Sequence, residues 1–197
     1  MSGPESIAAR YNRRATTFAA VVAAGPPDRW ASPSPCTAWT AADVLQHVLD
    51  MQAAMFTPLD RSLSPAPTVD ADPLGAFNHA RADVEDALAD PAVADTTVQT
   101  PMGPSTFAQH VDGVASADLV VHGWDLARAL GFEHRIEPAE VEAAWPGAQE
   151  MPDIMRVPEA FGPGMIVFGP IVEVPDDAPL QDRLLGLLGR DPHWEAP

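Results

Sequence analysis

Apolar residues recur at helical spacing through the first two thirds of the chain, and the runs end at turn residues. The first run stops at Gly25 and contains Ile7, Tyr11, Phe18 and Val22. A second helix is expected to begin after Thr40, because Thr40 and Asp43 have the spacing of a capping box. Its apolar stripe consists of Val44, Val48, Met51 and Met55. The pattern therefore predicts two amphipathic helices joined by a loop.

Two further helices are predicted beyond the Pro- and Ser-rich loop over 58–72. Asp72 and Pro73 are residue types typical of a helix start, and this third helix is expected to end before Pro91. After a brief extended piece at 97–99, a long fourth helix begins at Ser105, and Gly131 closes it as a C-terminal cap.

The pattern is less regular beyond Gly131. It predicts a short helix over 138–145, a packed loop or lid over 151–179, and a short terminal helix over 180–188. A chain of 197 residues is long enough for one buried core. We therefore predict an all-α fold with a single domain over 1–197, in which a core bundle at about 5–131 precedes a C-terminal lid or tail at 132–197.

Asp118 and His122 stand one helical turn apart in the fourth helix, so their side chains leave the same face. That face is otherwise apolar, and a carboxylate withdrawn from water is costly unless it is paired or bound to a metal. His47 lies on the stripe of the second helix and would complete a metal site if the two helices pack together. The same residues also fit a hydrogen-bonded pair, an Asp that orients a His for acid–base chemistry, or a core histidine at position 47.

Charge excludes several kinds of partner. The net charge of −17 argues against binding to nucleic acid or to an anionic membrane, since both depend on basic residues. No apolar stretch approaches the roughly 20 residues of a membrane-spanning helix. The N-terminus lacks the basic start and apolar middle of a signal peptide. We therefore expect a cytoplasmic protein.

All 11 basic residues are Arg, which excludes Schiff-base, P-loop and kinase mechanisms that need a lysine. Cys36 is the only cysteine, so the chain has no internal disulfide and no cysteine-built metal cage. Its neighbours carry no basic side chain that would favour a thiolate, and we expect Cys36 to pack before the second helix.

Three motifs coincide with this pattern: Pro-Cys-Thr-Ala-Trp-Thr at 35–40 leading into His47, His-Gly-Trp-Asp-Leu-Ala-Arg-Ala at 122–129, and Gly-Arg-Asp-Pro-His-Trp at 189–194. In this combination the chain resembles short, single-domain members of the metal-binding domain family of mycothiol-dependent maleylpyruvate isomerase, within the DinB-like superfamily. The resemblance spans nearly the whole chain, from Tyr11 to Trp194.

The resemblance implies a DinB-like up-and-down four-helix bundle that holds a divalent metal. Carried over residue by residue, its ligands are His47, Asp118 and His122, with Asp118 standing where the isomerase has the longer Glu. Asp125 is interpreted as an acceptor in the outer coordination sphere, and helix packing or replacement of Asp118 as the ligand are the alternatives. The isomerase has an additional C-terminal domain that helps form its active site, so its specific reaction is not carried over.

Two imidazoles and one carboxylate would leave open coordination positions, which favours a catalytic site. Zinc is the leading ion, and nickel, iron or manganese also accept these ligands. The first hypothesis is a metal-dependent S-transferase or thiol-assisted isomerase that uses mycothiol as cosubstrate. The alternatives are a thiol-independent metal-assisted cyclase or hydrolase of specialised metabolism, and a non-enzymatic metal protein that binds a small ligand or a partner through Met151, Met155, Phe161, Met165 and Phe168.

Two further residues are candidates for catalysis. His110 precedes Asp118 by two helical turns and could supply a proton, with a solvated histidine as the alternative. Arg128 could clamp the carboxylate of a small-molecule substrate, with a surface or structural role as the alternative. The sequence leaves a homodimer open.

Overall fold

The computed structural model describes residues 5–100, 103–159 and 167–196. The chain forms two compact units, residues 1–134 and 135–197. That these units behave as one domain stays a prediction. Phe161 and Met165, two residues of the predicted ligand-binding segment, lie outside the described residues.

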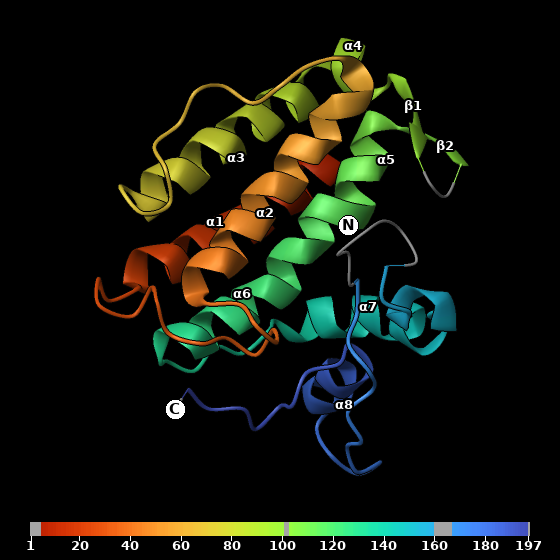
Figure 1. Cartoon of the computed structure of the whole chain (residues 1–197). Helices are drawn as coiled ribbons and strands as arrows, with labels where there is room; N and C mark the ends of the chain where they lie inside the picture. The colour runs from red at the N-terminus through yellow and green to blue at the C-terminus, as the bar shows by residue number, and fades with distance from the viewer. Residues whose placement is uncertain (1–4, 101–102, 160–166, 197) are drawn as a thin grey trace. The chain divides into compact units, whose positions relative to one another are not determined.

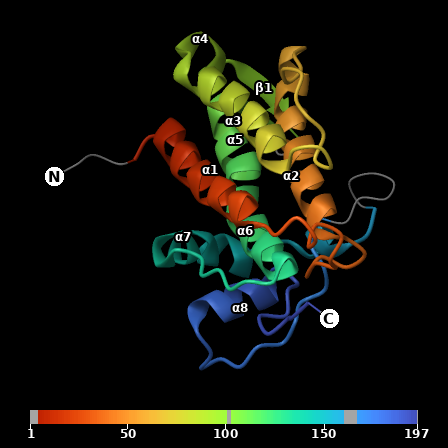
Figure 2. The same ribbon diagram turned by 90° about the vertical axis from the view of Figure 1, so that its left-hand side faces the viewer.

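The first unit is a bundle of four long helical segments, and the prediction of an all-α DinB-like fold is confirmed. Helix α1 (Ile7–Ala24) and helix α2 (Ala41–Phe56) each pack against both α3 (Pro73–Ala89) and α6 (Ala117–Leu130), as Figures 1 and 2 show. The core is made of the inward faces of these helices. Phe18 of α1 and Phe77 of α3 are both fully buried, and their ring centroids lie 4.8 Å apart.

Local hydrogen bonds explain where the helices begin and end. The predicted capping box is confirmed at α2, where the Thr40 hydroxyl accepts the Asp43 backbone N–H and the Asp43 side chain accepts the Thr40 N–H. Asp72 accepts the N–H of Gly75 at the start of α3. Gly131 ends α6 with a φ of 90°, a left-handed conformation that glycine adopts without steric cost.

Short elements connect α2 to α3 and α3 to α6. The 3-10 helix η1 (Thr57–Leu59) follows α2, and helix α4 (Pro91–Ala94) follows α3. Strand β1 (Thr97–Thr100) pairs antiparallel with β2 (Gly103–Thr106), which confirms the extended piece. The fourth helix was expected to begin at Ser105, but Ser105 pairs with Val98, and Thr106 caps α5 (Phe107–Val111).

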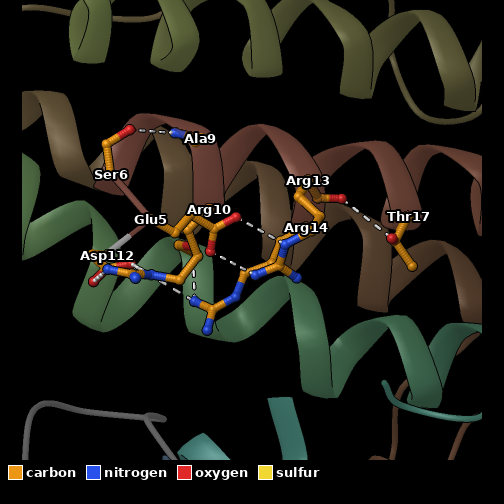
Figure 3. A network of polar contacts seen from close by, with 9 residues as sticks. Glu5, Ser6, Ala9, Arg10, Arg13, Arg14, Thr17 and Asp112 are labelled. Carbon is orange, nitrogen blue, oxygen red and sulfur yellow. Dashed lines mark hydrogen bonds and ion pairs between the residues drawn. The ribbon is translucent and has the colours of Figure 1, made fainter. Parts of the chain in front are cut away.

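A π-helical turn, η2 (Asp112–Ser116), stands between α5 and α6. The expectation of one regular helix from Ser105 to Gly131 was therefore wrong at this point. Arg10 of α1 donates two hydrogen bonds to the Asp112 carboxylate, at 2.8 and 2.6 Å, and Arg14 donates one to the buried Ser116 hydroxyl at 3.0 Å. Figure 3 shows Arg10 and Arg14 of α1 together with Asp112. Contacts with α1 thus hold the turn in place.

The second unit contains α7 (Pro138–Gln149), the 3-10 helix η3 (Asp153–Arg156) and α8 (Leu180–Leu187). Helix α7 was expected to end at Trp145, before Pro146, but it continues for another turn. The Pro146 carbonyl accepts the Glu150 N–H at 3.1 Å, so the turn after the proline keeps its hydrogen bonding. Within the described ranges, no helix has the length and apolarity to cross a membrane.

Candidate metal centre

His47 of α2 and Asp118 and His122 of α6 come together in the first unit. The His47 Nε2 atom lies 3.3 Å from Asp118 Oδ2, and the His122 Nε2 atom lies 3.8 Å from Asp118 Oδ1. The two imidazole centroids are 4.8 Å apart, and one potential ligand atom from each of the three residues lies within 4.8 Å of the others. The packing of α2 on α6 therefore places the three predicted ligands at one point.

Asp118 reaches both histidines despite its short side chain. Its Oδ2 atom is buried and has no hydrogen-bond partner among the described residues, although His47 Nε2 is near. A buried carboxylate oxygen without a partner is costly, because the oxygen has lost its hydration without gaining a donor. This oxygen is the feature of the site that a bound cation would satisfy.

Asp125 lies behind His122, on the side away from Asp118. The carboxylate is fully buried, and its Oδ2 atom is 2.9 Å from His122 Nδ1. Because a carboxylate accepts hydrogen bonds, this contact assigns the ring proton to Nδ1 and leaves the lone pair of Nε2 directed toward Asp118. Two acceptors then face each other at 3.8 Å, an arrangement that suits a shared cation.

The loop before α2 adds two side chains to this centre, Trp39 and Cys36. The Trp39 ring lies 4.8 Å from the His47 ring and 6.1 Å from the His122 ring, centroid to centroid. The Cys36 Sγ atom lies 3.2 Å from Asp125 Oδ2. Sequence reasoning assigned no contact to Trp39 and only a packing role to Cys36. Their position in the 35–40 motif, which leads into His47, was the available signal.

The centre is open on one side. The side chains of His47 and Asp118 are 29% and 28% exposed, whereas the His122 side chain is 8% exposed and that of Asp125 is fully buried. A cation held by the three residues would therefore have coordination positions accessible from the side of His47 and Asp118. This combination of a buried support and an accessible face is typical of catalytic metal sites.

The family model of the mycothiol maleylpyruvate isomerase N-terminal domain matches residues 11–127. The chain belongs to this family. The match covers more than half of the chain and includes all the residues of the centre just described, Asp125 among them.

Two Mycobacterium tuberculosis proteins are similar to this family member over nearly its whole length. They are Uncharacterized protein MT0763 of strain CDC 1551 and Uncharacterized protein Rv0738 of strain H37Rv. Each is 27% identical over 180 residues, which cover 91% of this chain and 95% of the relative. No solved structure matches the chain significantly.

The two candidate catalytic residues of this family member are not among those whose potential ligand atoms gather at the centre. The imidazole of His110, in α5, forms no hydrogen bond or ion pair within the described part of the chain, and burial lowers its pKa, which favours the neutral ring. The Arg128 guanidinium stacks over the Trp124 ring at 5.9 Å. Because α-helical residues are spaced by about 100°, Trp124 and Arg128 lie on a different side of α6 from His122.

Proposed function

We propose that this protein is a metal-dependent enzyme that binds one divalent cation through His47, Asp118 and His122. The observation that carries the proposal is the buried Asp118 Oδ2 atom, which has no hydrogen-bond partner within the described residues and lies beside the imidazole of His47. A cation would satisfy this oxygen and the Nε2 lone pair of His122 together.

The distances between the ligand atoms fit a small cation. Zinc binds nitrogen and oxygen ligands at about 2.0 to 2.2 Å, so two ligands of a tetrahedral site stand roughly 3.3 to 3.6 Å apart. Of the two contacts of Asp118, the one at 3.3 Å lies at the lower end of this range and the one at 3.8 Å lies slightly above it. Zinc is the ion we propose first. Nickel, iron and manganese accept the same ligands.

The protein's own residues would hold and shield the reacting groups. Asp125 fixes the tautomer and the orientation of His122, and the Trp39 ring covers one side of His47. The exposed edges of His47 and Asp118 leave an approach for a substrate. A divalent cation, when bound, would lower the pKa of a coordinating thiol and so favour the thiolate.

The family's description names mycothiol, and this supports our choice of substrate class. We propose that a low-molecular-weight thiol of the mycothiol type approaches the open side of the centre and attacks an activated alkene or an epoxide. A C–S bond forms while the π bond of the alkene or one C–O bond of the epoxide breaks, and the thiol proton passes to the neighbouring carbon or to the released oxygen. The reaction would be an S-transfer or a thiol-assisted isomerisation. Arg128 is not included in this mechanism, because it stacks on Trp124 away from the face of His122.

Metal content tests the first part of the proposal. Purified wild type should hold one divalent ion per chain by elemental analysis, whereas His47→Ala and His122→Ala should lose it while keeping a helical circular dichroism spectrum. His79→Ala is the matched control, because His79 is an exposed histidine on α3 and binds the Gly75 carbonyl of its own helix. Full metal content in His47→Ala would contradict the ligand assignment.

Turnover tests the second part. Metal-loaded wild type should consume an electrophile such as an epoxide or a maleyl compound only when a low-molecular-weight thiol is present. Turnover without a thiol would instead indicate the metal-assisted cyclase or hydrolase. If the protein holds its metal but consumes none of the electrophiles, either with or without a thiol, the result would indicate a ligand-binding role.

A further inference from the structure

We infer that Cys36 is a positioning residue of the metal centre: its thiol donates a hydrogen bond to Asp125, and so holds the carboxylate that orients His122. The inference rests on the proposed metal site. It assigns a role to the only cysteine of the chain, for which the sequence predicted packing alone.

The direction of the hydrogen bond follows from the chemistry of the partners. Cys36 Sγ lies 3.2 Å from Asp125 Oδ2, and His122 Nδ1 lies 2.9 Å from the same oxygen. An ionised carboxylate only accepts, so both the S–H and the N–H donate to it. Because Asp125 is fully buried, each donor counts toward replacing the water that its carboxylate has lost.

Hydrogen bonds to the backbone of Cys36 and its neighbours hold the thiol at Asp125. The buried Ser34 hydroxyl accepts the Cys36 N–H and donates to the Cys36 carbonyl, both at 3.2 Å. The same carbonyl accepts the Trp39 N–H at 3.0 Å, and the Trp39 carbonyl accepts the Ser34 N–H at 2.9 Å. Cys36 therefore sits in a closed loop whose position is fixed by several bonds.

The loop holds one residue in an unfavourable backbone conformation. Ala38 has a φ of 67°, in the left-handed region that residues with a Cβ atom rarely adopt. Such a conformation persists where the surrounding contacts determine it. Two such contacts are made from this loop: the Trp39 ring packs at a tilt against the His47 ring, and Cys36 binds the carboxylate behind His122. One short loop thus supports both histidines of the centre.

The same three groups could in principle form a second metal site, because ligand atoms of Cys36, His122 and Asp125 also lie within 4.8 Å of one another. The contact of 2.9 Å favours a hydrogen bond, since it matches the length expected for an N–H donor to oxygen, and the contact of 3.2 Å places the thiol within hydrogen-bonding reach of the same oxygen. Both contacts are shorter than the roughly 3.3 Å or more expected between ligands of a tetrahedral zinc ion.

Replacing the donor separates this role from simple packing. Cys36→Ala removes the donor and should weaken zinc binding roughly 10-fold, the lower end of the range for outer-sphere partners. Cys36→Ser keeps a donor and should restore the affinity to within about 3-fold of wild type. Asp125→Asn should weaken binding by roughly 10- to 100-fold. Adding Cys36→Ala to Asp125→Asn should cause no further loss, because Cys36 acts through Asp125.

The experiment is a competition titration of metal-free protein with zinc against a chromophoric chelator, with circular dichroism to verify that each variant is folded. Equal zinc affinity in wild type and Cys36→Ala would overturn the inference and leave the proposed function intact. A wild type that binds no zinc or other divalent ion would overturn both. If Cys36→Ala is not folded, Cys36→Ser and Asp125→Asn are compared instead. Equally weak zinc binding in these two variants would overturn the inference about Cys36. Near wild-type zinc affinity in Cys36→Ser with weak binding in Asp125→Asn would support it.

Cobalt loading distinguishes the hydrogen bond from a sulfur ligand. If Cys36 only positions Asp125, the cobalt form should bind one equivalent and show no thiolate charge-transfer band in the near ultraviolet. The visible bands, which report the ligand geometry, should change in Cys36→Ala and recover in Cys36→Ser. A charge-transfer band that is present in wild type and absent from both variants would identify Cys36 as a ligand and overturn the positioning role.

Discussion

The substitution Asp118→Asn should have opposite effects in the metal-free and the zinc-bound protein. It removes one negative charge without changing the length of the side chain. In the metal-free protein the change should be neutral or slightly stabilising, because the buried Oδ2 atom accepts no hydrogen bond from the described residues. In the presence of zinc it should remove most of the stabilisation, since a ligand has lost its charge.

The expected size follows from mass action. At a zinc concentration 100 times the wild-type dissociation constant, binding adds about 2.7 kcal/mol to the free energy of unfolding. For a chain of this length that raises the melting temperature by about 5 to 11 °C. A direct ligand should contribute at least as much affinity as an outer-sphere partner, so we take a loss of about 100-fold. The stabilisation then falls to about 0.4 kcal/mol, or about 1 to 2 °C.

The assay is differential scanning calorimetry. Protein prepared without metal is measured first alone and then with zinc at 100 times the wild-type dissociation constant. Asp86→Asn is the control, because Asp86 is an exposed carboxylate on α3 and its change alters the net charge equally. A full zinc shift in Asp118→Asn would refute the ligand role of Asp118. A loss of more than about 3 kcal/mol in the metal-free variant would show that Asp118 and His47 form a structural ion pair instead.

Two further predictions concern stability. Gln52 is fully buried and its amide has no hydrogen-bond partner among the described residues, so Gln52→Met should raise the free energy of unfolding in urea by about 1 to 3 kcal/mol; a decrease would show that a bound water satisfies the amide. Hydrogen bonds from the Thr40 backbone N–H and hydroxyl hold the pKa of Asp43 below its ordinary value of 3.8. The ionised carboxylate therefore stabilises the folded protein above about pH 4, and this contribution is lost as the pH falls through the folded-state pKa. Asp43→Asn should therefore lose stability less steeply than wild type in acid unfolding below about pH 4, and parallel curves would contradict the assignment.

The features predicted correctly from the sequence depend on neighbours in the chain. The capping box of Thr40 and Asp43 involves residues three positions apart, and the helix end at Gly131 depends on that residue's own backbone freedom. Asp118 and His122 share a face because they are four residues apart. Only His47 required a tertiary step, the packing of two apolar stripes, and the structure makes that contact.

The features that were missed depend on residues far apart in the sequence. The π-turn is held by Arg10 and Arg14, each 102 positions from its partner, and no local pattern at 112–116 predicts an interruption. The partner of Cys36 is 89 positions away, so the 35–40 motif alone does not identify the residue that its thiol contacts. Such pairs become visible only when the helices have been placed.

The π-turn also lets the bundle take up one additional residue without losing its packing. A π-turn holds one residue more than the α-helical turn it replaces, so the helices on either side keep the phase of an uninterrupted helix that is one residue shorter. The buried faces at Phe107 and at Leu119 therefore point into the core together, although the segment 112–116 carries the additional residue. In evolution the loss of one residue from this segment should therefore leave a regular helix with both faces still directed into the core, and Asp118 and His122 should keep their place in the site.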